Sequence, residues 1–204
     1  MTAPETLELK SVGAHVLLVT LNRPEASNAF NTKMAWDLVE LFERLSVSAN
    51  GTRVVVLTGA GDKAFCAGGD LKERKGMTDE AWQAQHLVYE RMIRAVITCP
   101  LPVIGAINGA AYGRGCELTA ALDFVDVSET ARFARAAVRI GIIPGAGGTQ
   151  TLARAVGERR AKELILSGNI FTAQDAMDWG LANRMCRAED LMDCTLAMAE
   201  TIAA

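Results

Sequence analysis

Hydrophobic residues along the chain follow two spacings in turn, one typical of strands and one typical of helices. Residues 6–10 and 14–21 are expected to form two short strands with a turn near Val12-Gly13, and Asn22-Arg23-Pro24 ends the second strand. Asn31 or Thr32 can cap the helix that follows, because a short polar side chain accepts hydrogen bonds from the free amides of a first turn. A spacing of three or four residues predicts one buried face of this helix, formed by Met34, Leu38, Leu41, Phe42 and Leu45.

The rest of the chain continues this alternation. Residues 53–58 and 101–107 are short apolar runs, the pattern of strands that are buried on both faces of a parallel sheet. Further elements are expected as an amphipathic helix at about 78–97, a short helix from Gly113-Arg114-Gly115 through 122, strands near 124–127 and 131–133, and helices from the glycine-rich turn at 144–148 to the end. Strands that alternate with helices predict an α/β fold with parallel sheets and crossover helices. We expect one domain over residues 1–204, with a core to about residue 150 and a helical region over 151–204.

The composition narrows the class of protein. Half of the 204 residues are hydrophobic, 22% are charged and the formal net charge is −3, which is typical of a soluble globular protein. This charge gives no electrostatic reason to expect nucleic acid or a membrane surface as a partner, and no apolar stretch reaches the ~18 residues of a membrane helix. The five cysteines contain no Cys-x-x-Cys pair, and the first ten residues lack a signal-peptide pattern. These features favour a cytoplasmic protein without a disulfide framework or a zinc site.

Glycine-rich segments after predicted strands raise the question of phosphate binding. The segment Gly59–Ala64 has the letters of a dinucleotide fingerprint, G-x-G-x-x-A. A dinucleotide site needs this loop to enter a helix, and the paired glycines at 68 and 69 do not start a helix well, so a nicotinamide site is the weaker interpretation. No G-x-x-x-x-G-K-[ST] loop occurs, which excludes a P-loop nucleotidase.

Two of the glycine segments could instead bind one oxygen atom together. Gly68-Gly69-Asp70 and Gly113-Arg114-Gly115 each follow a buried-strand candidate, so each could direct a backbone amide at the same carboxyl edge of the sheet. The alternative is that both are ordinary turns. Glu117 lies three residues after Arg114, on the same side of a first helical turn. It could act as an acid or base there, or could simply be favoured by the helix dipole.

Five ordered stretches resemble the crotonase superfamily, the enoyl-CoA hydratase/isomerase group. They are Asn22-Arg23-Pro24 with Asn28-Ala29-Phe30, residues 64–72, residues 102–109, residues 113–118 and residues 143–150. The resemblance implies a spiral core of ββα repeats, with a C-terminal helical lobe that would be truncated or absent in this chain. It further implies an acyl-CoA substrate, no separate cofactor, no metal, and a homotrimer or hexamer.

The resemblance also implies roles for individual residues. The amides of Gly69 and Arg114 would form an oxyanion hole for the thioester oxygen, and Glu117 would be the acid/base residue. Residues that would bind the substrate or its CoA part are Ala29, Ala67, Gly68, Asp70, Leu71 and Lys72, with Arg23 and Lys63 as further candidates for its phosphates.

Two positions depart from the family pattern. The second hydratase glutamate is replaced by Ala137, and Arg114 stands where the family usually has a small residue, so that its side chain could reshape the pocket or attract an acidic acyl group. A carboxylate such as Asp126 could take the place opposite Glu117. We therefore expect an enoyl-CoA hydratase/isomerase-type lyase with one glutamate, with isomerase or thioester hydrolase activity possible. The alternative is a non-catalytic CoA-binding homologue or assembly subunit.

Overall fold

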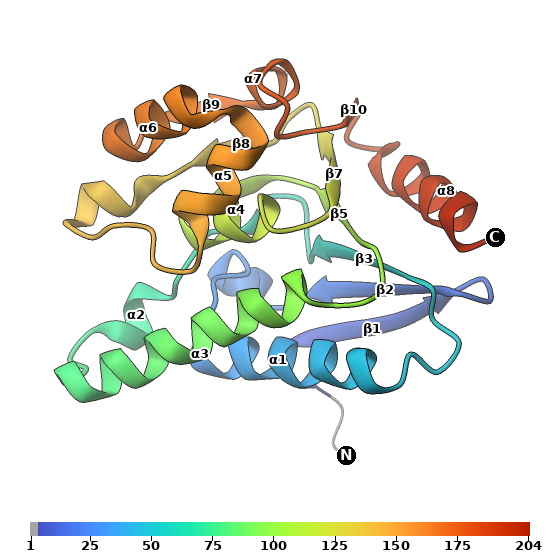
Figure 1. Ribbon diagram of the computed structural model, residues 1–204, viewed down its shortest axis with the longest axis horizontal. Coiled ribbons are helices and arrows are strands. Elements are labelled where there is room, and N and C mark those ends of the chain that lie inside the picture. The colour runs from blue at the N-terminus through green and yellow to red at the C-terminus, as the bar shows by residue number, and fades with distance from the viewer. Residues whose placement is uncertain (1–3) are drawn as a thin grey trace.

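Two β-sheets organise the chain, and the computed structural model describes residues 4–204 (Figure 1). The six-stranded sheet has the order β1 (Leu7–Val12), β2 (Val16–Leu21), β3 (Val54–Gly59), β5 (Val103–Ile107), β7 (Phe124–Ser128), β10 (Arg184–Cys186). The four-stranded sheet has the order β4 (Ala64–Cys66), β6 (Ala110–Tyr112), β8 (Arg132–Ala134), β9 (Ile170–Thr172). From β2 to β10 every neighbouring pair in the larger sheet is parallel, which confirms the predicted α/β class.

Helices connect these strands. They are α1 (Thr32–Val47), α2 (Leu71–Arg74), α3 (Asp79–Ile97), α4 (Arg114–Thr119), α5 (Gly148–Val156), α6 (Glu158–Ser167), α7 (Ala173–Asp178) and α8 (Leu191–Ala203), with 3-10 turns η1 (Pro24–Ala26) and η2 (Ala136–Ile140). Asn31 caps α1 by accepting from the amide of Met34, and Thr78 caps α3 by accepting from that of Ala81. Both helices therefore begin where the sequence pattern predicts. No helix within residues 4–204 has the length and apolar character needed to cross a membrane.

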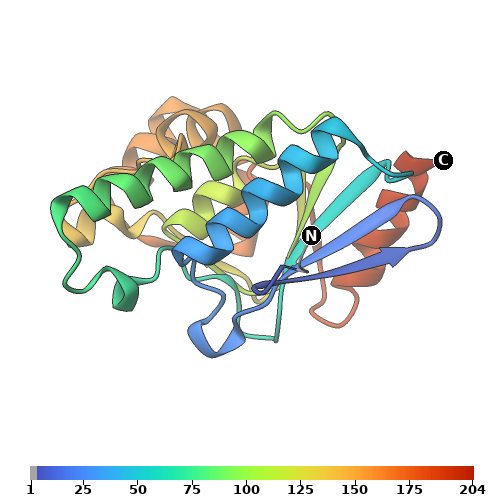
Figure 2. The same ribbon diagram turned by 90° about the horizontal axis from the view of Figure 1, so that it is seen from below.

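The larger sheet is covered on both faces, which explains its continuous apolar strands. Alternate residues of β3 belong to different apolar clusters: Val55 and Leu57 pack with α1 and α3, whereas Val54 and Val56 pack with α8. Helices α1 and α3 lie side by side on one face of the sheet, and α8 lies on the opposite face (Figures 1 and 2). Because both faces are buried, these strands show no alternation of apolar and polar residues.

The structure differs from the predicted elements in the short strands. β4 lies in the glycine-rich segment 59–69, where a loop was expected, and β6 lies between the expected strand at 101–107 and the expected helix from Gly113, where no element was assigned. β9 and β10 lie in the region 151–204 that was expected to be helical. Each of these strands has three residues, too few to produce a clear periodic pattern, and each forms through pairing with a neighbouring strand. The short helix expected to reach residue 122 ends at Thr119.

Candidate active site

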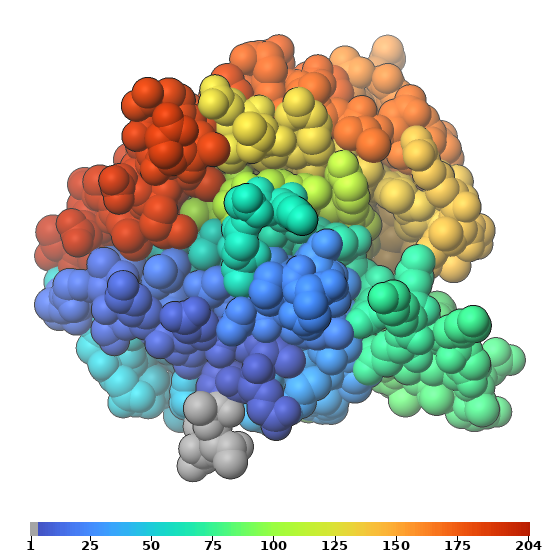
Figure 3. Space-filling model, turned by 180° about the vertical axis from the view of Figure 1, so that it is seen from behind, coloured from blue at the N-terminus to red at the C-terminus, as the bar shows by residue number. Residues whose placement is uncertain are grey.

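A pocket of about 150 Å³ opens between the two glycine-rich turns, α2 and the segment around η2. Its lining comes from Ala67, Gly68, Gly69, Leu71 and Arg74, from Tyr112, Gly113, Arg114 and Glu117, and from Arg135, Ala136, Ala137, Ile140, Ile142, Ile143, Pro144 and Gly145. In the space-filling view, the segment around residues 136–146 (yellow) faces α2 and the start of α3 (green) across a recess (Figure 3). Segments distant in sequence therefore meet at one site.

The two glycine-rich turns approach each other closely. A Cβ atom on Gly68 would lie 2.8 Å from the carbonyl oxygen of Tyr112 and 3.4 Å from the amide nitrogen of Arg114. Gly68 also has a φ of +103°, a conformation that residues with side chains rarely adopt. Only glycine fits between the turns at this position, and its neighbour Gly69 is thereby placed beside Arg114.

The backbone amides of Gly69 and Arg114 are free donors at the pocket wall. Phe30 donates from its amide to the carbonyl of Gly68 at 2.7 Å and accepts from the amide of Asp70 at 2.8 Å. The amide of Gly69, between these two bonds, consequently points away from Phe30. Arg114 is the first residue of α4, where a helix leaves its amide without an intrahelical partner. Within residues 4–204 neither amide donates a hydrogen bond.

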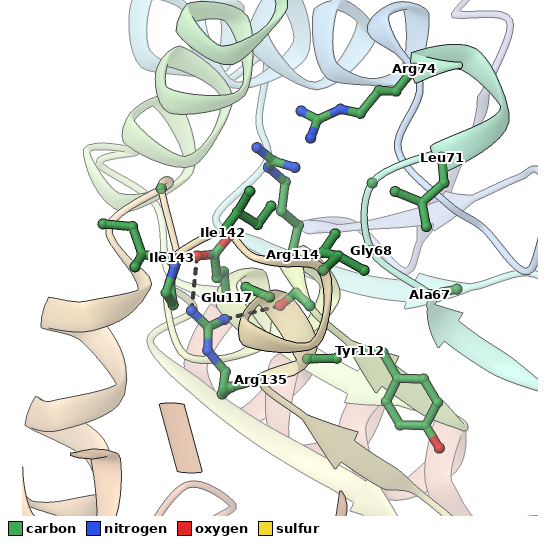
Figure 4. Close-up of a pocket in the computed structure, with 17 residues that line it drawn as sticks. Ala67, Gly68, Leu71, Arg74, Tyr112, Arg114, Glu117, Arg135, Ile142 and Ile143 are labelled. Atoms are coloured by element: carbon green, nitrogen blue, oxygen red, sulfur yellow. Dashed lines mark hydrogen bonds and ion pairs between the residues drawn. The ribbon is translucent and has the colours of Figure 1, made fainter. Parts of the chain in front are cut away.

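Glu117 is buried in the pocket wall and is paired with an arginine that the sequence interpretation missed. Its Oε1 atom accepts from Nη2 of Arg135 at 2.9 Å, and Nη1 of Arg135 donates to the carbonyl of Gly113 at 3.0 Å (Figure 4). The side chains of Glu117 and Arg135 are only 3% and 1% exposed. The signal for Arg135 was weak, because it is one of three arginines in the segment 131–140, which also holds Ala137.

The amino end of α5 encloses this ion pair. A Cβ atom on Gly148 would lie 2.0 Å from Nη2 of Arg135 and 2.6 Å from Oε1 of Glu117. The close approach requires glycine at this position. It also excludes solvent from one side of the pair, which strengthens the attraction between its charges.

The pocket wall holds no second carboxylate. Ala137 lines the pocket, as the sequence comparison with the family pattern indicates, and Glu117 is the sole acidic residue of the lining. Asp126 lies on β7, where it accepts from Oγ1 of Thr195 at 3.1 Å, and it does not line the pocket. Burial raises the pKa of Asp126. The hypothesis that Asp126 stands opposite Glu117 is therefore wrong.

The residues proposed to bind substrate fall into two groups. Ala67, Gly68 and Leu71 line the pocket together with Gly69 and Arg114, whereas Ala29, Asp70 and Lys72 do not. The carbonyl of Ala29 and the carboxylate of Asp70 both accept from Arg23, at 2.6 and 2.9 Å. Burial would raise the pKa of Asp70, but hydrogen bonds from Arg23 and from the amides of Glu73 and Lys72 lower it overall. Asp70 thus caps α2 and holds the loop that carries Gly69.

The cysteines beside the site are buried thiols. Burial raises the pKa of Cys66 to about 12 and that of Cys116 to about 11, so that neither is a thiolate at neutral pH. Within residues 4–204 no group of three or more His, Cys, Asp or Glu side chains is arranged to hold a metal ion. The charged side chains of the pocket lining are Glu117, Arg74, Arg114 and Arg135.

Comparisons with known proteins give one consistent result. Residues 11–204 match the enoyl-CoA hydratase/isomerase family model. The chain is 40% identical over 189 residues to a mitochondrial enoyl-CoA hydratase of Pongo abelii, covering 91% of this chain and 63% of that protein. It is 37% identical over 200 residues to an (E)-benzylidenesuccinyl-CoA hydratase of Thauera aromatica, covering 98% and 76%. A crystal structure of an enoyl-CoA hydratase from Bacillus anthracis matches with a TM-score of 0.95 at 39% identity, covering 98% of this chain and 77% of that one.

Proposed function

Because the chain belongs to the enoyl-CoA hydratase/isomerase family, we propose that it binds an enoyl-CoA and moves protons on it with Glu117. The observation that carries the proposal is the position of Glu117 in the same pocket wall as two free backbone amides. A carboxylate beside paired amide donors suits a reaction in which negative charge develops on a carbonyl oxygen while a proton is transferred nearby.

In this proposal the amides of Gly69 and Arg114 bind the thioester oxygen. Charge gathers on that oxygen when the thioester becomes an enolate, so both hydrogen bonds strengthen in the transition state. One such donor contributes roughly 3–4 kcal/mol to the lowering of a barrier. Both amides are fixed by the fold before substrate binds, because Gly69 is held by the pairing of its neighbours with Phe30, and Arg114 by the start of α4.

Glu117 carries the proton in each step. For hydration of a 2-enoyl-CoA, it takes a proton from water while the water oxygen bonds to C3 and the electrons move to the thioester oxygen. The protonated carboxyl group then returns that proton to C2, which restores the carbonyl. For isomerisation of a 3-enoyl-CoA, Glu117 removes a proton from C2 and delivers it to C4. Arg135 holds the carboxylate in one orientation and offsets its charge on the side that Gly148 shields from solvent.

A second candidate function rests on Ala137. The family resemblance implies a second glutamate there, and an alanine can neither donate nor accept a proton. A chain that binds acyl-CoA without turning it over would keep the two amides and have no use for Glu117. The two candidates therefore differ in one property, whether the carboxylate of Glu117 affects a reaction.

The test is turnover by the purified protein with crotonyl-CoA and with a 3-enoyl-CoA, followed by product analysis. We expect hydration or isomerisation, and we expect Glu117→Gln to lower kcat by about 10²- to 10⁴-fold, since positioned proton transfer contributes about this factor. Glutamine preserves the volume and can still accept from Arg135. The control is Asp126→Asn, which changes an equally buried carboxylate outside the pocket and should keep wild-type turnover. CoA binding without turnover of any enoyl-CoA would support the non-catalytic alternative.

A further inference from the structure

Two guanidinium groups lie at the end of the pocket away from the Glu117–Arg135 pair. The side chain of Arg114 extends from the first turn of α4 toward α3 and approaches Arg74, which comes from α2 (Figure 4). Both arginines line the pocket. Arg114 is 9% exposed, so its charge is almost fully removed from solvent.

The contacts of these two cations within residues 4–204 include no carboxylate. The guanidinium of Arg114 lies 4.3 Å from the ring centre of Tyr89, and its Nη2 is 3.5 Å from Nδ1 of His86. Nε of Arg74 donates to Oε1 of Gln85 at 2.8 Å. Across the described part of the chain, no carboxylate lies within 4.0 Å of either guanidinium. Nε of Arg114 and Nη2 of Arg74 are buried and make no hydrogen bond in the same part of the chain, as is also true of Nε of Arg135, so it is the missing carboxylate that distinguishes this end.

The neighbouring acids are engaged elsewhere. Glu73 accepts from Gln85 and from the amide of Thr32, and Glu90 lies 3.2 Å from His86. Asp70 is paired with Arg23. The positive charge at this end of the pocket is therefore not neutralised by the acids beside it.

A buried positive charge without a counter-ion costs free energy, and the lowered pKa of Arg114 reflects this cost. Burial lowers the pKa of Arg114, the nearby charge of Arg74 lowers it further, and the charge of Glu117 offsets only part of this effect. The contact between the guanidinium of Arg114 and the ring of Tyr89 compensates for part of the lost hydration, but the ring carries no negative charge. An anion bound between the two guanidinium groups would balance their positive charge through charge-assisted hydrogen bonds.

We propose that this pocket selects an acyl-CoA whose acyl group carries a second carboxylate, and that Arg74 and Arg114 bind that carboxylate. The inference rests on the proposed function, in which the amide of Arg114 binds the thioester oxygen. The guanidinium of the same residue is then one side chain away from the thioester. An anion at that distance belongs to a short acyl group, because the phosphates of CoA are separated from the thioester by the whole pantetheine arm.

The test compares two saturated thioesters that differ in charge and cannot be hydrated. Calorimetry measures the binding of glutaryl-CoA, whose acyl group ends in a carboxylate, and of pentanoyl-CoA, whose chain has the same number of carbons and ends in a methyl group. Because a charge-assisted hydrogen bond is worth more than a neutral one, we expect wild-type protein to bind glutaryl-CoA about 10- to 100-fold more tightly. Arg74→Met should bring the ratio of the two affinities close to one, and Arg74→Lys should keep part of the preference.

The control is Arg94→Met, which removes an exposed arginine from α3 and should keep the wild-type ratio. Equal binding of both thioesters by the wild-type protein would overturn the inference alone, leaving the proposed function intact. A preference that survives Arg74→Met would overturn the assignment to this pair of arginines. Equal weakening of both thioesters in that variant would mean that Arg74 serves the CoA phosphates, and this also overturns the inference. Failure to bind any CoA thioester would overturn the proposed function itself.

Discussion

The two ends of the pocket differ in whether their buried charges have a counter-ion within the protein. At one end, the carboxylate of Glu117 meets Arg135 at 2.9 Å, and both side chains are buried together, so that the charges cancel within the protein. At the other end, Arg74 contacts Gln85, Arg114 contacts the ring of Tyr89, and neither guanidinium has a carboxylate within 4.0 Å in the described part of the chain. The charges of the first arrangement balance each other in the folded chain, and we call it the complete end. The charges of the second would be balanced only by a bound anion, and we call it the incomplete end. In the functions proposed above, the first end transfers protons and the second binds the acyl group.

The largest expected effect comes from breaking the complete end. Arg135→Met removes the guanidinium and leaves Glu117 as an unpaired buried carboxylate, for which the usual cost is about 3–5 kcal/mol of stability. Methionine fills most of the space of the arginine side chain, so the loss of stability comes mainly from the removed charge and not from a cavity. Chemical denaturation at neutral pH measures the change in the free energy of unfolding.

The matched control for this substitution is Arg139→Met, which replaces an exposed arginine in η2, the 3-10 turn that directly follows Arg135. We expect a change within about 0.5 kcal/mol for this surface position. If Arg135→Met proved as mild as the control, the Glu117–Arg135 pair would not be the closed, self-compensating unit that the comparison requires.

Removing a cation from the incomplete end should have the opposite sign. Arg114→Met exchanges a buried charge without a counter-ion for an apolar side chain and keeps the backbone amide of residue 114. Replacing buried charge in this way is often stabilising, and after subtraction of the lost contact with Tyr89 we expect a gain of up to about 1–2 kcal/mol. Denaturation in the absence of ligand measures it. If Arg114→Met lowered the free energy of unfolding as much as Arg135→Met, the charges at both ends of the pocket would be balanced within the protein, and the comparison would fail.

The sequence predicted the fold where the pattern was long or had a chemical marker. The capping residue expected at Asn31 or Thr32, the helix expected at about 78–97 and the apolar runs of β3 and β5 are local features, and they agree with the structure. β9 and β10 could not be predicted, since three residues carry no period and their stability comes from pairing with β8 and β7. β9 and β10 therefore form because of pairing with strands distant in sequence, which local patterns do not show.

The site was predicted through residues that a motif marks, and missed where only contacts define it. Gly69, Arg114 and Glu117 line one pocket, and Ala137 is part of the same wall, whereas the roles of the two amides and of Glu117 stay predictions. Arg135 carries no motif and becomes visible only when β8 brings it against α4. The direction of the Arg114 side chain toward Arg74 depends on packing against α3, which spacing along one helix cannot show.

The smallest expected effect concerns the support of the arginine-rich end. Asp70 caps α2, the helix that carries Arg74, and pairs with Arg23 at 2.9 Å. Asp70→Asn keeps an oxygen for the cap but removes the charge, so we expect a loss of about 1 kcal/mol at neutral pH. Because the pKa of Asp70 is lowered in the folded protein, this contribution is complete above the ordinary value of 3.8 and disappears as the pH falls through the pKa of the folded state.

The measurement is the difference in unfolding free energy between wild type and Asp70→Asn as a function of pH. We expect a constant difference from neutral pH down to about pH 4, then a decline toward zero. The control is Asp62→Asn, at an exposed position of the loop between β3 and β4. We expect its unfolding free energy to differ little from that of the wild type at every pH. A difference that grows as the solution becomes acidic would contradict the sign of the Asp70 shift. Such a result would also mean that the Asp70–Arg23 pair does not stabilise α2. The proposed binding of an acyl carboxylate needs Arg74 in a fixed position, and α2 carries Arg74, so this proposal would be weakened as well.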